Sequence, residues 1–177
     1  MINSKLTLSF LFVLTWASCN CNCKNQSTTA DELKIAAMLD SLNTAAAQAD
    51  FSRYFSFYAD DAVFMGTDAT ERWNKKSFME WSKPYFDRGK AWSFTAVKRN
   101  ILFDESGKMA WFDELLDTQM KICGGSGVVV KKGNDWKIKQ YVLSITIPNS
   151  VADSIISVKS AEEDSLLKAW GQHSSNQ

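Results

Sequence analysis

The stretch "GVVVKKGNDWKIKQYVLSITI", residues 127–147, decides the fold class. Trp136 and Ile138 alternate with lysines, which is the two-residue period of a half-buried strand. The triplet Gly-Asn-Asp that precedes Trp136 is a strong hairpin signal between two such runs. We therefore predict antiparallel strands over 127–132 and 135–147.

The same period extends back toward the N-terminus as far as Trp92. Further strands are predicted over 92–104 and 109–119, with the turn-forming residues "DESGK" between them. The run "CGGSG" at 123–127 is predicted as the next turn or bulge, because it lacks the Gly-Lys-Ser/Thr ending and the following helix of a phosphate-binding loop. The second half of the domain is thus a meander of about four long strands.

Helical spacing dominates the first half of the chain. Apolar residues at intervals of three and four predict a first helix within 30–50. A short aromatic helix follows, and the strand-like run that begins at Ala62 comes after it. Asp60 and Asp61, between the two, are predicted to form a turn or a cap, since aspartate bonds its own backbone neighbours.

A third helix is predicted within 74–90, where Phe78, Trp81 and Tyr85 form one apolar stripe. Pro84 lies within that stripe and predicts a kink or an early end. Because helices come first and strands after them, the layer rule predicts an α+β domain. Its N-terminal helices pack on one side of a strongly curved antiparallel sheet.

The two ends of the chain differ from the domain in composition. Residues 1–18 have the features of a secretion signal, with Lys5 followed by an apolar run shorter than the ~20 residues of a membrane-spanning helix. Small residues directly before Cys19 resemble the bacterial lipobox, in which the cysteine is acylated; a plain signal peptide cleaved nearby is the alternative. Residues 19–30 are predicted as a polar tether, and 150–177 as a C-terminal helix with a polar tail.

Charge and metal-ligating residues exclude several classes of function. Lys plus Arg equals Asp plus Glu at 20 each, so no net field attracts nucleic acid. Single residues separate Cys19, Cys21 and Cys23, whereas zinc sites usually place two between paired cysteines. The one histidine, His173, lies close to the C-terminus, which argues against a Ser-His or Cys-His nucleophile. We expect no metal, no cofactor and no nucleic-acid partner.

The order of several short motifs resembles one known family. "YADDAVFMGTD", "AWFDELLD", "GSGVVVK" and "WKIKQY" followed by "IPN" are similar to the SnoaL-like domains of the nuclear transport factor 2-like superfamily, over residues 31–149. The resemblance implies a cone whose sheet wraps around a pocket, and frequent dimers. The superfamily includes ketosteroid isomerase-like and polyketide cyclase enzymes, and also domains that only bind or assemble. Many members carry a histidine where this chain has Gln140 or Val142, so histidine acid–base chemistry is not expected.

Strand parity separates the acidic residues of "AWFDELLD". Asp113 and Asp117 share one face, which we predict to be solvated. Glu114 stands among apolar residues on the other face. Inside the cone, Glu114 would have a raised pKa and could act as a catalytic proton acceptor. The favoured alternative is a structural ion pair of Glu114 with Arg99 or Lys131 on a neighbouring strand.

Aromatic and amide side chains are the candidates for the wall of the pocket, since ligand pockets are mostly apolar with a few placed polar groups. The alternative for each ring is an ordinary aromatic core. Gln140 and Tyr141 lie on opposite faces of their strand, so at most one of them points inward unless the strand bulges, and the family resemblance implies that it is Gln140. Asp68 and Glu71 lie on a short loop, where carboxylates often bind backbone amides. The predicted pocket residues are Tyr58, Trp73, Trp81, Tyr85, Trp92, Phe112 and Gln140.

Two functions from different classes remain open at this point. The first is an exported domain, periplasmic or at the cell surface and attached to the membrane only through a lipid on Cys19, that binds a small, largely apolar molecule. It would do so with or without isomerase- or hydratase-type proton transfer. The second is a non-catalytic homodimeric assembly or protein-interaction module at the cell surface. An open cone with Glu114 at its base favours the first, and a dry, filled cone with a large apolar outer face favours the second.

Overall fold

The computed structural model describes residues 23–174 in four α-helices, one short 3-10 helix and six strands. Their order along the chain is α1 (Cys23–Ala47), α2 (Phe51–Ser56), β1 (Tyr58–Met65), β2 (Arg72–Asn74), α3 (Lys75–Asp87), β3 (Phe94–Phe103), β4 (Met109–Thr118), β5 (Lys121–Lys132), β6 (Asp135–Ile145), η1 (Asn149–Val151) and α4 (Ala152–Ser174). The predicted secretion signal and Cys19 lie outside the described residues.

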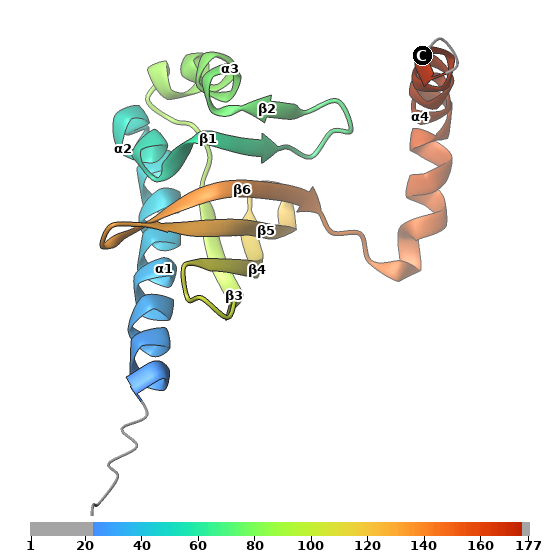
Figure 1. Ribbon diagram of the computed structural model, residues 1–177. Helices are drawn as coiled ribbons and strands as arrows, with labels where there is room; N and C mark the ends of the chain where they lie inside the picture. The colour runs from blue at the N-terminus through green and yellow to red at the C-terminus, as the bar shows by residue number, and fades with distance from the viewer. Residues whose placement is uncertain (1–22, 175–177) are drawn as a thin grey trace, which may run out of the picture.

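The six strands form one curved sheet in the order β2-β1-β6-β5-β4-β3 (Figure 1). The α+β class and the meander from β3 to β6 are confirmed. The sheet is mixed and not purely antiparallel, because β1 pairs with β6 in parallel. A parallel pair needs a long connection, which the intervening residues 66–134 supply.

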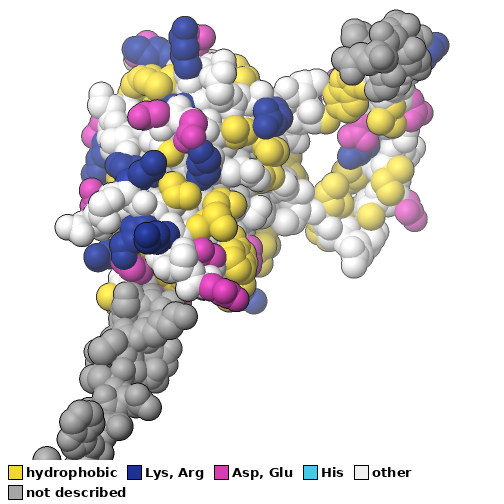
Figure 2. All heavy atoms as spheres, in the orientation of Figure 1, with side chains coloured by type: hydrophobic (Ala, Val, Ile, Leu, Met, Phe, Trp, Pro, Cys, Tyr) yellow, Lys and Arg dark blue, Asp and Glu magenta, His cyan; other side chains and the backbone are white. Residues whose placement is uncertain are grey.

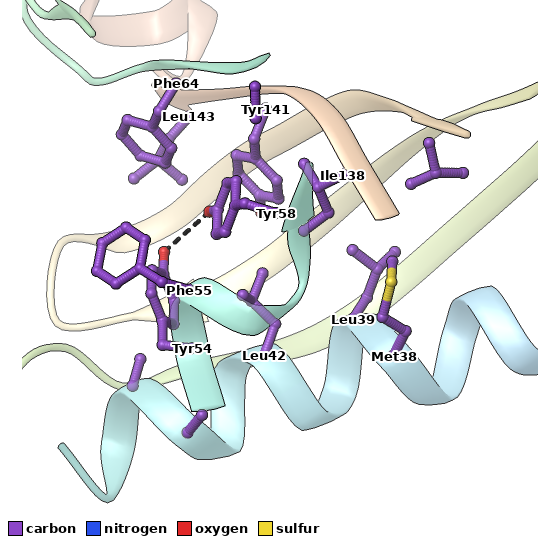
Figure 3. Packing of buried hydrophobic residues seen from close by; sticks show 14 of the residues in the cluster. Met38, Leu39, Leu42, Tyr54, Phe55, Tyr58, Phe64, Ile138, Tyr141 and Leu143 are labelled. Carbon is purple, nitrogen blue, oxygen red and sulfur yellow. Dashed lines mark hydrogen bonds between the residues drawn. The ribbon is translucent and has the colours of Figure 1, made fainter. Parts of the chain in front are cut away.

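Helices α1, α2 and α3 cover the inner face of the sheet (Figure 1). Buried side chains of α1 and α2 meet those of β1 and β6 to form the core, as Figure 3 shows for Leu39, Leu42, Phe55 and Ile138. The alternation on β4 is strict, with every second residue buried from Ala110 to Thr118. That pattern is what a strand with one face on a core requires.

Two segments that the sequence predicted as turns lie inside strands. Asp60 and Asp61 lie within β1, exposed, and form ion pairs with Lys75 (3.2 Å) and with Lys139. The run "CGGSG" lies within β5. In both cases residue types that favour turns were placed in a strand by tertiary contacts.

The glycines of β5 are required by close approach and not by a turn. A Cβ on Gly125 would lie 2.6 Å from the Tyr141 hydroxyl, and one on Gly127 would lie 2.3 Å from the Gln140 carbonyl oxygen. Both positions face the inside of the cone, where side chains of β4 and β6 fill the space. Glycine is used here because the neighbouring groups approach the backbone itself.

Helix α3 continues through Pro84, so the predicted early end is wrong. Its buried side is formed by Phe78, Ser82 and Phe86, which anchor the helix on both sides of the proline. Trp81 and Tyr85, predicted in the same stripe as Phe78, lie at its edge with 39% and 36% of their surface exposed. They are therefore accessible from outside the core.

The two terminal helices extend beyond the compact body. Helix α1 begins at Cys23, so residues 23–30, within the predicted tether, are helical. Helix α4 stands apart from the sheet (Figure 1), and hydrophobic side chains lie along it (Figure 2), among them Ile156 and Val158. In the described part of the chain, none of the helices combines the length and apolarity needed to cross a bilayer.

A methyl group added to Gly127 should test the close packing on β5. Gly127→Ala is expected to lower the free energy of unfolding by about 1–3 kcal/mol, because the new Cβ overlaps backbone and cannot be relieved by a rotamer change. Gly124→Ala is the matched control on the same strand, where a Cβ meets only Thr146 at 3.7 Å. Urea unfolding should show a change within about 0.5 kcal/mol for that control. Equal effects of the two substitutions would contradict the packing described.

Candidate functional site

A cavity of about 220 Å³ opens at the end of the cone beside α3, β1 and β2. Residues of α1, α2, α3, β1, β2, β3 and β6 and of the loops around them line it. Most of the wall is aromatic and includes Phe64, Trp73, Phe78, Trp81, Tyr85 and Trp92. The interior of the cone is therefore open at this end.

The rings of this wall pack against one another. Phe64 and Phe78 stack with centroids 4.0 Å apart and planes 9° from parallel. Trp73 stacks on Trp81 at 4.7 Å, and Trp81 meets Tyr85 at 5.1 Å. Each ring packs against a neighbour, so these rings together form an apolar aromatic wall.

Polar groups reach the cavity at a few places. Asn43 of α1 is 8% exposed and lines the cavity, and its amide makes no hydrogen bond within residues 29–171. Glu71 lines it from the loop between β1 and β2, and its Oε2 accepts a hydrogen bond from the Asp68 backbone N–H at 3.2 Å. This confirms the amide-binding role expected for Glu71. Gln119 adds an amide from the β4–β5 turn.

Glu114 has the structural role that the sequence favoured. It is 3% exposed, and its Oε2 accepts from Arg99 Nε at 2.8 Å and lies 2.8 Å from Arg99 Nη2. The Tyr141 hydroxyl donates to its Oε1 at 2.8 Å. Lys131, the other candidate partner, pairs with Asp31 at 2.6 Å. Both oxygens of Glu114 are thus occupied by protein groups.

The surroundings of Arg99 and Tyr141 keep both side chains protonated. Burial alone lowers the pKa of Arg99, but Glu114 and Asp40 together raise it above its ordinary value, so the guanidinium stays charged. Burial, followed by the charge of Glu114, raises the pKa of Tyr141 well above its usual range. Tyr141 therefore remains a hydrogen-bond donor at neutral pH.

A second tyrosine contact lies deeper in the core. The hydroxyls of Tyr54 and Tyr58 are 3.0 Å apart, as the dashed line in Figure 3 marks. Burial raises the pKa of both residues above the ordinary tyrosine value. Tyr54 lines the cavity, whereas Tyr58 lies behind it.

The structure brings four of the predicted pocket residues to one cavity: Trp73, Trp81, Tyr85 and Trp92. Glu114, Tyr58, Phe112 and Gln140 are not among its lining residues.

Gln140 does not line the cavity, because a bulge changes the direction of the side chains along β6. The register of β5 and β6 shifts between the pairs Val129–Ile138 and Val128–Gln140. This extra residue turns Tyr141 inward, where it stacks on Phe64 at 5.8 Å. The prediction of Gln140 as the inward-facing residue follows the unbulged alternation, which the bulge interrupts.

Asn43 was missed, although the sequence carries a signal for it. It follows Leu42 and lies four residues after Leu39, on the apolar face of α1. A polar residue on such a face is a candidate for a buried polar contact. Asp113 and Asp117, predicted to be solvated, are exposed as expected. Within residues 29–171, no group of three His, Cys, Asp or Glu side chains could hold a metal ion.

Known proteins with related sequences and folds agree with this architecture. Residues 35–148, more than half of the chain, match the SnoaL-like domain family, and no curated protein matches the sequence. A nuclear transport factor 2-like protein of unknown function from Pseudomonas putida is similar in structure, with a TM-score of 0.58 and 15% identity over 68% of this chain and 90% of that one.

Two further solved structures share the fold. One is a proposed scytalone dehydratase from Novosphingobium aromaticivorans, with a TM-score of 0.58 and 14% identity over 70% of this chain and 89% of that one. The other is a proposed calcium/calmodulin-dependent kinase II association domain from Exiguobacterium sibiricum, with a TM-score of 0.53 and 10% identity over 68% of this chain and 96% of that one. At these identities the similarity shows the nuclear transport factor 2-like fold alone.

Neutralising Glu114 should destabilise the fold because it leaves the buried Arg99 cation with only the exposed carboxylate of Asp40. Glu114→Gln is expected to lower the free energy of unfolding by about 3–5 kcal/mol. Asp113→Asn is the control, since Asp113 is the exposed neighbour on β4 and bonds only Asn100 in that region, at 2.8 Å. Its cost in urea unfolding should stay within about 0.5 kcal/mol. A stable Glu114→Gln protein would refute the structural role of the pair.

Proposed function

The chain belongs to the SnoaL-like domain family, and from its open aromatic cavity we propose that it binds a small, largely apolar, ring-containing ligand. The aromatic wall at the end of the cone is the observation that carries the proposal. Ligand sites are concave and mostly apolar with few polar groups, which is how this cavity is built. Asn43, Glu71 and Gln119 supply the polar groups.

The size of the cavity supports a ligand with one ring. Its volume of about 220 Å³ is below the roughly 300–1,000 Å³ of pockets for drug-sized molecules. The stacked wall of Trp73, Trp81 and Tyr85 offers flat surface, on which a planar group packs with little loss of its own freedom. A large polycyclic ligand would need part of the wall to move.

Binding, and not turnover, is the function proposed. The expected proton acceptor, Glu114, is held by Arg99 and Tyr141 and does not line the cavity. Isomerase- or hydratase-type chemistry with Glu114 as base would require this pair to separate inside the core. Such separation costs several kcal/mol for each ion left unpaired.

Location and membrane attachment remain part of the proposal on the grounds of sequence alone. We propose that residues 1–18 direct export, and that Cys19 receives a lipid that holds the domain at the membrane surface. The domain would then work in the periplasm or at the cell surface, where a small ligand can reach the open end of the cone.

A second candidate function is homodimerisation through the outer face of the sheet. Leu102 and Trp111 are cross-strand partners on that face and are 53% and 44% exposed, and Leu115 adds a third exposed apolar side chain. Contiguous apolar side chains on a sheet often mark a protein interface. Dimerisation there would leave the cavity on the opposite face free, so both functions can coexist.

Two exposed tryptophans, Trp81 of α3 at the cavity and Trp111 on the outer face of the sheet, test the ligand site. A panel of neutral, cationic and anionic one-ring compounds should include a binder, detected by ligand-observed NMR with the whole protein. Trp81→Ala is expected to weaken that binding about tenfold, because it removes part of the aromatic wall. Trp111→Ala, equally exposed but outside the cavity, should leave the affinity within about twofold. Absence of any binder, or equal losses in both variants, would refute the proposal.

The dimer has its own test on the outer face. Leu102→Glu should convert a dimer to a monomer, because two carboxylates would be desolvated in a symmetric interface. Light scattering during gel filtration measures the mass of each variant, with Asp113→Asn as the control on the same face. A monomer in the unmodified protein at micromolar concentration would exclude this candidate.

A further inference from the structure

Glu71 is the one charged side chain among the residues that line the cavity, and all the other lining residues are neutral. No lysine or arginine forms an ion pair with it in the described residues 29–171. An acid beside apolar surface favours a positive partner, since the low local dielectric strengthens the attraction between opposite charges. The carboxylate also repels an anionic ligand.

The loop between β1 and β2 holds this carboxylate in place. Glu71 donates its backbone N–H to the Asp68 carbonyl at 3.0 Å and accepts from the Gly66 N–H at 2.9 Å with its own carbonyl. The carboxylate lies against the backbone of Gly66, where an added Cβ would come within 2.1 Å of Glu71 Oε2 and push the carboxylate aside. Together with the hydrogen bond from the Asp68 backbone N–H, this contact holds the charge at the loop.

The aromatic wall is suited to a cation as well. The faces of tryptophan and tyrosine rings carry partial negative charge and attract ammonium and guanidinium groups. The chain itself shows such a contact on one lining ring, since the guanidinium of Arg88, a residue outside the cavity lining, lies 4.8 Å from the centre of the Tyr85 ring. That face of Tyr85 is occupied, so a ligand cation would use the indoles. Trp73, Trp81 and Trp92 add three indoles to the same cavity.

Asn43 supplies an independent sign of a polar ligand group. The Asn43 residue is 8% exposed and lines the cavity, and its side chain makes no hydrogen bond within residues 29–171. Its amide is not among the fully buried polar groups, so it is open to the cavity and can bond a polar group of a ligand there. The site thus combines one carboxylate, one accessible amide and several rings.

From this combination we propose that the ligand is a small organic cation, an aromatic or alkylated ammonium ion with its charge beside Glu71 and its apolar part against the rings. This inference rests on the proposed ligand-binding function and adds the charge of the ligand. Recognition then uses Coulomb attraction to Glu71 and cation–π contact with the wall, and neither force acts on a neutral molecule of the same shape.

Phenyltrimethylammonium and tert-butylbenzene form the matched pair of probes, since they share a shape and differ in charge. At low salt, ligand-observed NMR with the whole protein should give the cation about tenfold tighter binding or more. Glu71→Gln, which keeps the shape of the side chain, should reduce the affinity for the cation about tenfold and leave that for tert-butylbenzene within about twofold. Glu80→Gln, an exposed acid on α3 outside the cavity lining, is the control and should change neither.

The outcomes separate this inference from the proposed function. If both probes bind equally, or if Glu71→Gln weakens both alike or neither, the cationic ligand is ruled out while the ligand cavity stands. If neither probe binds and the wider panel of one-ring compounds is also negative, both proposals fall. Circular dichroism of each variant distinguishes a lost site from a lost fold.

Discussion

The ion pair between Arg99 and Glu114 is the constraint on which the inside of the cone depends. It ties β3 to β4 at 2.8 Å, and Arg99 continues to α1, where Nη1 donates to the Ala36 carbonyl at 3.1 Å and meets Asp40 at 2.9 Å. Tyr141 on β6 completes it. Three strands and the longest inner helix therefore converge on one carboxylate. Removing Glu114 leaves the buried Arg99 with only the exposed carboxylate of Asp40, and removing Arg99 leaves Glu114 buried without a cation, so the arrangement is fixed once the core forms.

This pair divides the interior into two parts with different uses. On one side, apolar residues such as Ile35 and Leu39 fill the space between α1 and the sheet and are fully buried. On the other side, Tyr141 presents its ring to the open cavity while its hydroxyl stays bonded to Glu114. The buried ion pair thus has a structural role, because it positions Tyr141 in the cavity wall. A ligand in the cavity contacts the lining residues and not the ion pair. Gly125 makes the division possible, because any side chain there would displace Tyr141 or Glu114.

The parts of the fold that are encoded by local sequence patterns could be predicted, and the parts that depend on tertiary contacts between distant segments could not. The meander and its last hairpin follow from the two-residue period and from Gly133, whose φ of 64° suits the turn. The ion pair of Glu114 with a neighbouring strand, with Arg99 as one of two possible partners, could be predicted because alternate residues of a strand share a face. The inward turn of Tyr141 depends on a one-residue bulge in β6 that no local signal marks. A glycine needed for close approach of neighbouring groups cannot be distinguished in the sequence from a glycine needed for a turn. The run "CGGSG" therefore predicts a turn or bulge, although it lies within β5.

The central claim is that a ligand enters the aromatic cavity and leaves the buried pair untouched. Two-dimensional ¹H–¹⁵N NMR of the labelled protein, titrated separately with tert-butylbenzene and phenyltrimethylammonium, reports on both places at once. Binding of either probe should shift the indole N–H signals of Trp73 and Trp92 and the side-chain amide of Asn43, while the Arg99 Nε–H signal, bonded to Glu114, stays in place. A shift at Arg99 with unchanged indole signals, or no shift with either probe, would contradict the account.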